Sequence, residues 1–190
     1  KVQQKAVKVG ATYGLYTIIE SGIMAPSSKN RQPWKFVVVS GSSKAKMAEV
    51  FSAGIKREET GEALLPDSIQ FIDGAKYTLE IMNQAPVIIF VLNTLGLGKD
   101  MFSPLTDEER VFEVCNIQSI SAAIQNILLA ADEKGIGSLW ICDIYFAYKE
   151  LCDWLHTDGE LLAAIALGYP EESPEARPRK QLKEVVEWLE

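Results

Sequence analysis

A polar loop is the part of this 190-residue sequence with the clearest capacity for chemistry. It reads Ala-Pro-Ser-Ser-Lys-Asn-Arg-Gln-Pro-Trp and occupies residues 25–34, between an expected helix and an expected strand. Its hydroxyl, amide and charged groups offer many hydrogen bonds at positions that a turn can fix. Any one of these residues could belong to an ordinary turn. The run as a whole is typical of a loop that binds a polar ligand.

An Arg-Pro-Arg sequence near the end of the chain is a second candidate for ligand binding. Pro178 favours an extended backbone at Arg177, so Arg177 and Arg179 should face the same way. Two guanidinium groups on one side of a chain suit the oxygens of an anion. From these residues alone, a solvated basic pair that balances the neighbouring glutamates is an equally good reading.

The common catalytic and metal-binding motifs are missing from the sequence. The one histidine, His156, has no evident partners for a catalytic triad, and HExxH, P-loop and GxGxxG motifs are absent. The three cysteines do not have the spacing of metal ligands. We therefore predict no side chain acting as an acid, base or nucleophile, and no metal site. Cys142 is expected to be a small packed residue, and Trp34 and Trp140 are expected to lie in the core.

Composition excludes several classes of protein. The net charge of −7 and the pI of about 4.9 do not provide the basic surface that nucleic acids or anionic membranes require. The longest apolar run, residues 86–92, is far shorter than a membrane-spanning helix. Scattered, unpaired cysteines indicate a reduced, cytoplasmic protein. The length fits one domain, residues 1–190.

Hydrophobic spacing predicts both helices and strands, without a strict alternation of the two. The expected helices span residues 12–23, 43–55, 76–84, 107–134 and 146–155, and residues 182–189 are expected to form a last helix or a docking arm. The expected strands span residues 34–39, 86–93, 138–144 and 161–167. Residues 57–74 and 94–106 are expected to be loops. This order favours an α+β fold with three layers around a small sheet.

The expected helix at residues 107–134 is apolar around most of its circumference. Such a helix is usually central and buried, and its polar members, including Asn116 and Ser119, then need partners inside. Thr106 is placed to cap its first turn. One small domain cannot cover so much apolar surface, so we expect a homodimer. We also expect a mobile arm at residues 1–13, a lid at 56–83 and a C-terminal arm at 170–190.

Several segments together resemble the nitroreductase family of FMN-dependent oxidoreductases. They are the sequence APSSKNRQPWKFVVV from residue 25, QAPVII from 84, AAIQNILLAA from 122 with GIGS from 135, AIALGYP from 164 and PRKQL from 178. They follow the family's order from about Gly14 to the end of the chain. The family usually opens with an Arg-Arg-Ser-x-Arg segment that helps to hold FMN, and residues 1–13 contain no such motif. Such a segment either lies upstream of Lys1, is absent, or has been replaced.

The resemblance implies a three-layer α/β/α fold, with a small mixed sheet around a long central helix, that forms a dimer with two flavins at the interface. It also implies a set of flavin-binding residues. The loop of one subunit would contribute Pro26, Ser27, Ser28 and Asn30, and the long helix would contribute Ser119. The end of a strand would face the flavin with Trp140, Ile141, Cys142 and Asp143, including a backbone amide near flavin N5. Arg177 and Arg179 would hold the phosphate.

The activity implied by the resemblance is a two-step oxidoreduction. NADH or NADPH would reduce FMN, and a small acceptor would then enter the vacated pocket, which gives ping-pong kinetics. Nitroaromatics, quinones, enones and free flavins are candidate acceptors, and residues 56–83 and 94–106 would set the specificity. Two alternatives stay open at this stage. One is a family relative that carries out flavin-dependent dehalogenation or flavin fragmentation. The other is a protein that binds or stores flavin without turnover.

Overall fold

The computed structural model describes residues 11–97, 103–157, 159–173 and 175–189, and of residues 11–13 it describes the backbone alone. Its helices are α1 (Ala11–Ile23), α2 (Ser43–Glu59), α3 (Ile72–Gln84), α4 (Asp107–Glu133), α5 (Tyr148–Leu155) and α6 (Leu182–Val185). Its strands are β1 (Trp34–Ser40), β2 (Val87–Asn93), β3 (Gly137–Ile141) and β4 (Glu160–Gly168). Three short 3-10 helices lie at Ser28–Asn30, Pro66–Phe71 and Asp143–Ala147.

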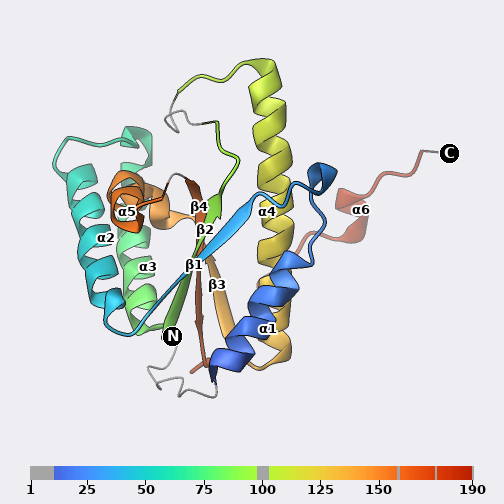
Figure 1. Ribbon diagram of the computed structural model, residues 1–190, viewed down its shortest axis with the longest axis horizontal. Helices are drawn as coiled ribbons and strands as arrows, with labels where there is room; N and C mark the ends of the chain where they lie inside the picture. The colour runs from blue at the N-terminus through green and yellow to red at the C-terminus, as the bar shows by residue number, and fades with distance from the viewer. Residues whose placement is uncertain (1–10, 98–102, 158, 174, 190) are drawn as a thin grey trace.

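The predicted three-layer α+β fold is confirmed. A four-stranded sheet in the order β1-β2-β4-β3 separates a layer of α2, α3 and α5 from a layer of α1 and α4 (Figure 1). The expectation of a mixed sheet is wrong for the described residues, where all three strand pairs are antiparallel. The chain leaves β1 through α2 and returns through α3, so β2 starts where β1 ends and Ser40 pairs with Val87. A single crossover helix would have given parallel strands instead.

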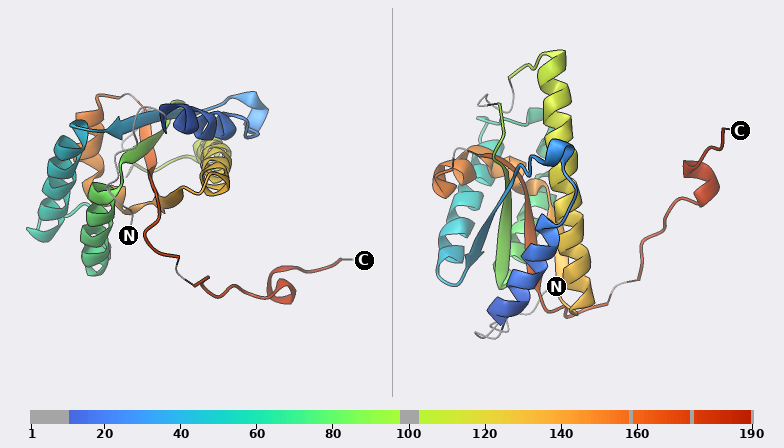
Figure 2. Two further views of the ribbon diagram at one scale, coloured as in Figure 1. Left: turned by 90° about the horizontal axis from the view of Figure 1, so that it is seen from below. Right: turned by 45° about the vertical axis from the view of Figure 1, so that its right-hand side comes forward.

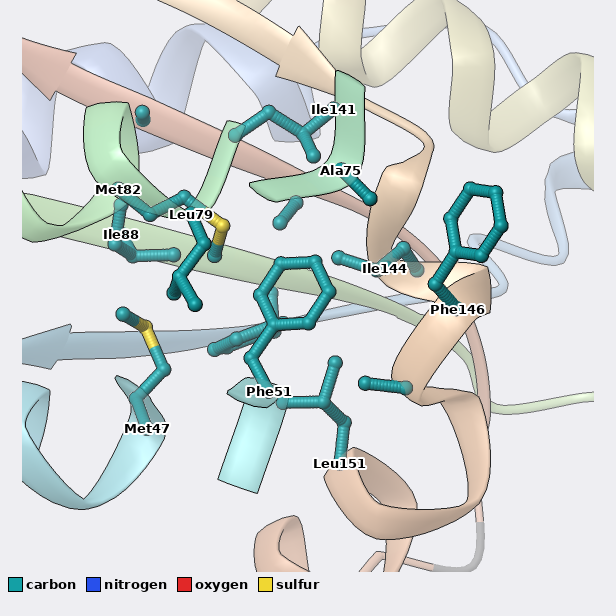
Figure 3. Packing of buried hydrophobic residues seen from close by; sticks show 14 of the residues in the cluster. Met47, Phe51, Ala75, Leu79, Met82, Ile88, Ile141, Ile144, Phe146 and Leu151 are labelled. Carbon is teal, nitrogen blue, oxygen red and sulfur yellow. The ribbon is translucent and has the colours of Figure 1, made fainter. Parts of the chain in front are cut away.

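Strand β2 is buried along its whole length and joins the two cores. Ile88, Phe90 and Leu92 pack on the side of α2, α3 and α5, where Phe51 and Leu151 meet them (Figure 3). The alternate residues of the strand, Val87, Ile89 and Val91, pack on the side of α1 and α4. The unbroken apolar run predicted a strand buried on both faces, and the structure confirms it.

Helix α4 begins and ends as the sequence predicts. The Thr106 hydroxyl accepts a hydrogen bond from the Glu109 backbone amide at 3.3 Å, and the Glu109 carboxylate accepts one from the Thr106 amide at 2.9 Å. These two bonds form a capping box. At the other end Gly135 takes a left-handed conformation with φ of +67°, which stops the helix.

In the single chain α4 leaves part of its apolar surface uncovered, which agrees with the expectation that one small domain cannot cover this helix. Val111, Val114, Ile117 and Leu129 are exposed along the helix, although α4 packs on α1 and on the sheet. By length and composition α4 could cross a membrane. Its packing in the second core, which includes Ile120, Ile124 and Ile127, accounts for its apolar character as a core helix with one uncovered face.

The segment expected to be a lid is more ordered than the sequence suggested. Helix α2 continues to Glu59, and α3 begins at Ile72 and buries Ala75, Leu79 and Met82 in the first core. The expected helix at 76–84 is present, but the sequence analysis missed the last turn of α2 and the first turn of α3 because glycines and charges dilute the apolar spacing there. Only the connection between α2 and α3, residues 60–71, is left as a surface segment.

The start of that connection is tied down by a buried carboxylate. The Glu58 side chain accepts hydrogen bonds from the backbone amides of Leu64 and Leu65, both at 3.1 Å, and from Arg57 at 2.5 Å. Arg57 also donates to both carboxylate oxygens of Glu150 on α5. Hydrogen bonds to Glu150 therefore raise the pKa of Arg57.

The two ends of the chain differ from the body. Residues 1–10 of the predicted N-terminal arm lie outside the described residues, and α1 already begins at Ala11. After β4 the chain runs away from the body as an extended arm (Figure 2). Its predicted helix, residues 182–189, is reduced to the four residues of α6, which have no buried side chain.

A close approach between α2 and the 3-10 helix at Asp143–Ala147 gives the first testable prediction. A Cβ atom at Gly54 would lie 2.3 Å from the Ala147 Cβ and 2.4 Å from its Cα. We expect Gly54→Ala to lower the free energy of unfolding by about 1–3 kcal/mol, because overpacking outweighs the gain in helix propensity. Gly74→Ala in α3 is the matched control, since nothing lies within 4 Å of its Cβ position. Urea unfolding of both variants checks this, and equal stability would contradict it.

Candidate functional site

The polar loop forms a closed turn with an unusual backbone. Ser27 accepts a hydrogen bond from the Gln32 amide at its side chain (3.0 Å) and one from the Asn30 amide at its carbonyl (2.9 Å). Lys29, Asn30 and Gln32 all have positive φ angles, of 52°, 53° and 50°. Left-handed backbone is rare outside glycine, and such strain is concentrated at binding sites.

Helix α4 packs against this loop. The Ser119 hydroxyl is buried, accepts a hydrogen bond from the Ser28 amide at 3.0 Å and donates one to the Cys115 carbonyl at 2.7 Å. The family resemblance implied that Ser119 contacts the flavin from the long helix. In the structure Ser119 contacts the loop, and its hydroxyl binds the Ser28 amide. Pro26 and Asn30 are exposed at the loop surface, where a ligand can reach them.

The predicted strand-end group lies at the C-terminal end of β3. Ile141 is buried in the core formed by α2, α3 and α5. Trp140 pairs with Ile165, which belongs to the other core, and is 36% exposed. The expectation that Trp140 is a core residue is wrong, because β3 is an edge strand whose outer residues no helix covers completely. Trp34 is partly buried against the second core, as expected.

Cys142 and Asp143 turn the chain from β3 into the 3-10 helix that follows. Asp143 accepts a hydrogen bond from the Thr78 hydroxyl of α3. Cys142 is exposed, so the expectation that it is a packed residue is wrong; the strand ends one residue before it. Partial desolvation and the adjacent Asp143 carboxylate raise the pKa of the Cys142 thiol. This cysteine is accessible but holds its proton, which does not suit a redox-active thiol.

Arg177 and Arg179 are exposed and belong to the C-terminal arm, which runs away from the body (Figure 2). The Arg179 guanidinium donates to the carbonyl of Arg177 at 3.2 Å. The predicted site residues thus form three separate groups in the single chain: the loop with Ser119, the strand end, and the two arginines. Only the loop and Ser119 are in contact. The strand end lies across the sheet, and the arginines are on an arm that leaves the body.

The sequence analysis missed several residues that hold the loop. Arg31 donates a hydrogen bond to the buried Asn116 side chain of α4 at 3.4 Å and lies 4.4 Å from the ring centroid of Phe112. The Pro33 carbonyl accepts hydrogen bonds from both the amide and the hydroxyl of Thr94. One signal was available: a polar Asn116 in an apolar helix needs a partner. No sequence signal identified that partner as Arg31.

Comparison with known proteins assigns the class. Residues 14–169 match the Nitroreductase family, so this chain belongs to that family. A Bacillus subtilis protein named as an NAD(P)H nitroreductase, YfhC, is 26% identical over 171 residues, which are 88% of this chain and 78% of the relative.

Solved structures agree with the fold. A BluB-like flavoprotein from Clostridium difficile 630 superposes with a TM-score of 0.77 at 24% identity, covering 100% of this chain and 93% of the other. A nitroreductase from Desulfovibrio desulfuricans, solved in complex with FMN, has a TM-score of 0.65 at 26% identity and covers 98% and 87%. The nitroreductase fold predicted from the loop and the later segments is therefore confirmed.

The protonated state of Cys142 gives the second prediction. Because only the thiolate is alkylated, we expect iodoacetamide to label Cys142 slowly near neutral pH, with a midpoint above that of an ordinary thiol. Asp143→Asn should move this midpoint to lower pH, since it removes the neighbouring negative charge. Thr78→Val removes the hydrogen bond to Asp143 but keeps its charge, so it should not lower the midpoint. Peptide mass spectrometry measures the labelling, and an unchanged midpoint in Asp143→Asn would refute the role of Asp143.

Proposed function

We propose that this protein is an FMN-dependent oxidoreductase that takes electrons from NADH or NADPH and passes them to a small organic acceptor. The observation that carries the proposal is the loop at residues 27–32, held in a left-handed conformation on α4 in a chain of the nitroreductase family. The D. desulfuricans relative with bound FMN and the B. subtilis relative named for NAD(P)H support it. We also propose that it works in the cytoplasm.

The residues present fit FMN by their chemistry. The loop offers short hydroxyl and amide groups with fixed backbone directions, which suit the polar edge of a flavin. Arg177 and Arg179 offer two fixed positive charges, which suit a phosphate. When bound, FMN would supply the hydride chemistry, so the protein needs only to bind and orient it. A site without an evident acid–base dyad is compatible with this role.

In the proposed site each group has a distinct task. Pro26, Ser27, Ser28 and Asn30 would bind the flavin edge, with Ser119 keeping Ser28 in place. Trp140 and the backbone of residues 141–143 would line the ring. Burial of Ile141 in the core fixes the backbone of this strand end. The exposed side of Trp140 would leave room beside the flavin for the nicotinamide and, after its departure, for the acceptor, as ping-pong kinetics require.

A homodimer is the second part of the proposal. A single chain separates the three groups, whereas a second copy could bring the loop of one subunit to the strand end of the other. The exposed residues of α4, which include Val111, Val114 and Leu129, form an apolar face that a partner would cover. The arm carries Leu182, Val185 and Trp188, the last 82% exposed, and such an arm gains stability only against another surface. We propose that it wraps around the partner.

The activity prediction follows directly. We expect the purified protein to be yellow and to bleach when NADH or NADPH is added without oxygen, because hydride transfer reduces the bound flavin. Adding nitroaromatic, quinone, enone, halogenated aromatic or free flavin acceptors one at a time should restore the colour with the true acceptor. Double-reciprocal plots of the steady-state rate against donor concentration, measured at several fixed acceptor concentrations, should be parallel, as expected for ping-pong kinetics. A yellow protein that neither donor bleaches would instead be a flavin-binding or storage protein.

The C-terminal arm gives a further prediction. We expect Arg177→Ala/Arg179→Ala to weaken FMN binding by several kcal/mol, taking about 1.5–3 kcal/mol for each charged hydrogen bond. Riboflavin, which lacks the phosphate, should lose much less. Lys180→Ala/Lys183→Ala is the matched control, because it removes two charges from the same exposed arm. Fluorescence titration measures both ligands.

Sedimentation velocity shows whether each arm variant is still dimeric. If the arginine variant binds FMN as tightly as the parent, the phosphate is held elsewhere. A monomeric parent protein at micromolar concentration would overturn the dimer.

A further inference from the structure

Three segments that are far apart in the sequence meet beside the loop. They are the end of the loop at residues 31–33, the chain just after β2 at residues 93–95, and α4 at Asn116. The Thr94 amide donates to the Pro33 carbonyl at 2.7 Å, and the Thr94 hydroxyl donates to the same oxygen at 3.1 Å. These contacts fix the end of the loop against the segment that leaves β2.

Two buried asparagines hold the neighbouring residue, Leu95, at both of its backbone polar groups. Asn93 accepts from the Leu95 amide at 3.1 Å, and Asn116 donates to the Leu95 carbonyl at 3.4 Å. Each asparagine is 1% exposed. The Asn93 Nδ2 group donates to the Glu160 carboxylate at 3.1 Å, so both the oxygen and the nitrogen of the Asn93 side chain have hydrogen-bond partners.

The remaining end of Asn116 holds the loop itself. Its Oδ1 atom accepts a hydrogen bond from Arg31 Nη1 at 3.4 Å, while the Arg31 guanidinium stacks over Phe112, one turn earlier on α4. Ser119, about one turn later on α4, accepts the hydrogen bond from Ser28. One face of α4 thus binds the loop at two points, Ser28 and Arg31.

Two of the three left-handed residues of the loop, Lys29 and Asn30, lie between these two anchors. Lys29 and Asn30 have left-handed backbones, and such conformations persist only where the surroundings impose them. A leucine at position 116 could serve the packing of an apolar helix, so a buried amide there needs another reason. Its two hydrogen bonds go to the loop and to the segment after β2.

We propose that Asn116 is a positioning residue for the cofactor, which holds the Arg31 end of the loop so that Ser27, Ser28 and Asn30 keep their binding geometry. Asn116 acts through Arg31 and does not itself touch the flavin. This inference rests on the proposed FMN site and adds to it a residue that controls affinity from inside the helix layer.

A double-mutant cycle on FMN affinity tests the proposal. The variants are Arg31→Met, Asn116→Leu and the double variant, and the readout is the dissociation constant from the fluorescence of FMN released on dilution of the holoprotein. We expect each single substitution to weaken FMN binding by about tenfold, the size of one hydrogen bond. We expect the double variant to be no weaker than the weaker single one, because both substitutions break the same connection.

Asn126→Leu is the matched control. Asn126 lies on the same helix and donates to the Ser21 carbonyl of α1 at 3.1 Å, so its loss affects packing but not the loop. Its FMN affinity should stay within about twofold of the parent, although its resistance to urea should fall as in Asn116→Leu. If Asn116→Leu does not fold, the cycle is run with Asn116→Ala.

The outcomes separate this inference from the proposed function. Parent-like FMN affinity in the Asn116 variant, an equal loss in Asn126→Leu, or losses that multiply in the double variant would each overturn the positioning role while the flavin site stands. A parent protein that binds no FMN would overturn the proposed function itself.

Discussion

The burial of β2 on both faces is the constraint on which the rest of the structure depends. All seven residues of the strand are buried, and their side chains alternate between two cores. Such a strand requires a helical layer on each side, because exposing either face would leave large apolar side chains in water. Helices α2, α3 and α5 supply one layer, and α1 and α4 supply the other; in the sequence, α2 and α3 lie between α1 and α4.

The position of the candidate site follows from this arrangement. The loop at 27–32 connects α1, in one layer, to β1 at the edge of the sheet. It passes over the middle of α4, where Ser119 and Asn116 contact it. The chain after β2 emerges at the same place, since Trp34 pairs with Asn93. The polar contacts around the loop are thus a consequence of where two neighbouring strands start and end.

Two parts of the chain expose large apolar side chains, helix α4 and the C-terminal arm. Helix α4 is apolar enough for a core but covers only one side of the sheet, and the C-terminal arm carries large apolar residues without a local core. A small domain gains stability mainly from burying such surface. The proposed dimer would use both features together, and it would also join loop, strand end and arm into one site. In the proposed dimer, the cofactor site would therefore lie at the subunit interface.

The sequence by itself determined the element types, the ends of most elements and the family. The apolar run of β2, the Thr106 cap and Gly135 are local signals that act through neighbouring residues, so they can be read without a fold. The loop sequence at 25–34 likewise identified the candidate site. The extent of α3 was hidden, because its apolar spacing is diluted and only the contact with α2 makes it a core helix.

Tertiary structure alone decided how the elements meet. The antiparallel sheet depends on α2 and α3 returning the chain to one end of the sheet, which no local pattern specifies. The left-handed residues Lys29 and Asn30 lie between two anchors, Ser119 and Asn116, that belong to another helix. Asn116 and Arg31 are 85 residues apart, and their contact exists only because β2 and α4 place both beside the loop. Local propensity acts over a few residues, whereas these contacts depend on the packing of whole layers.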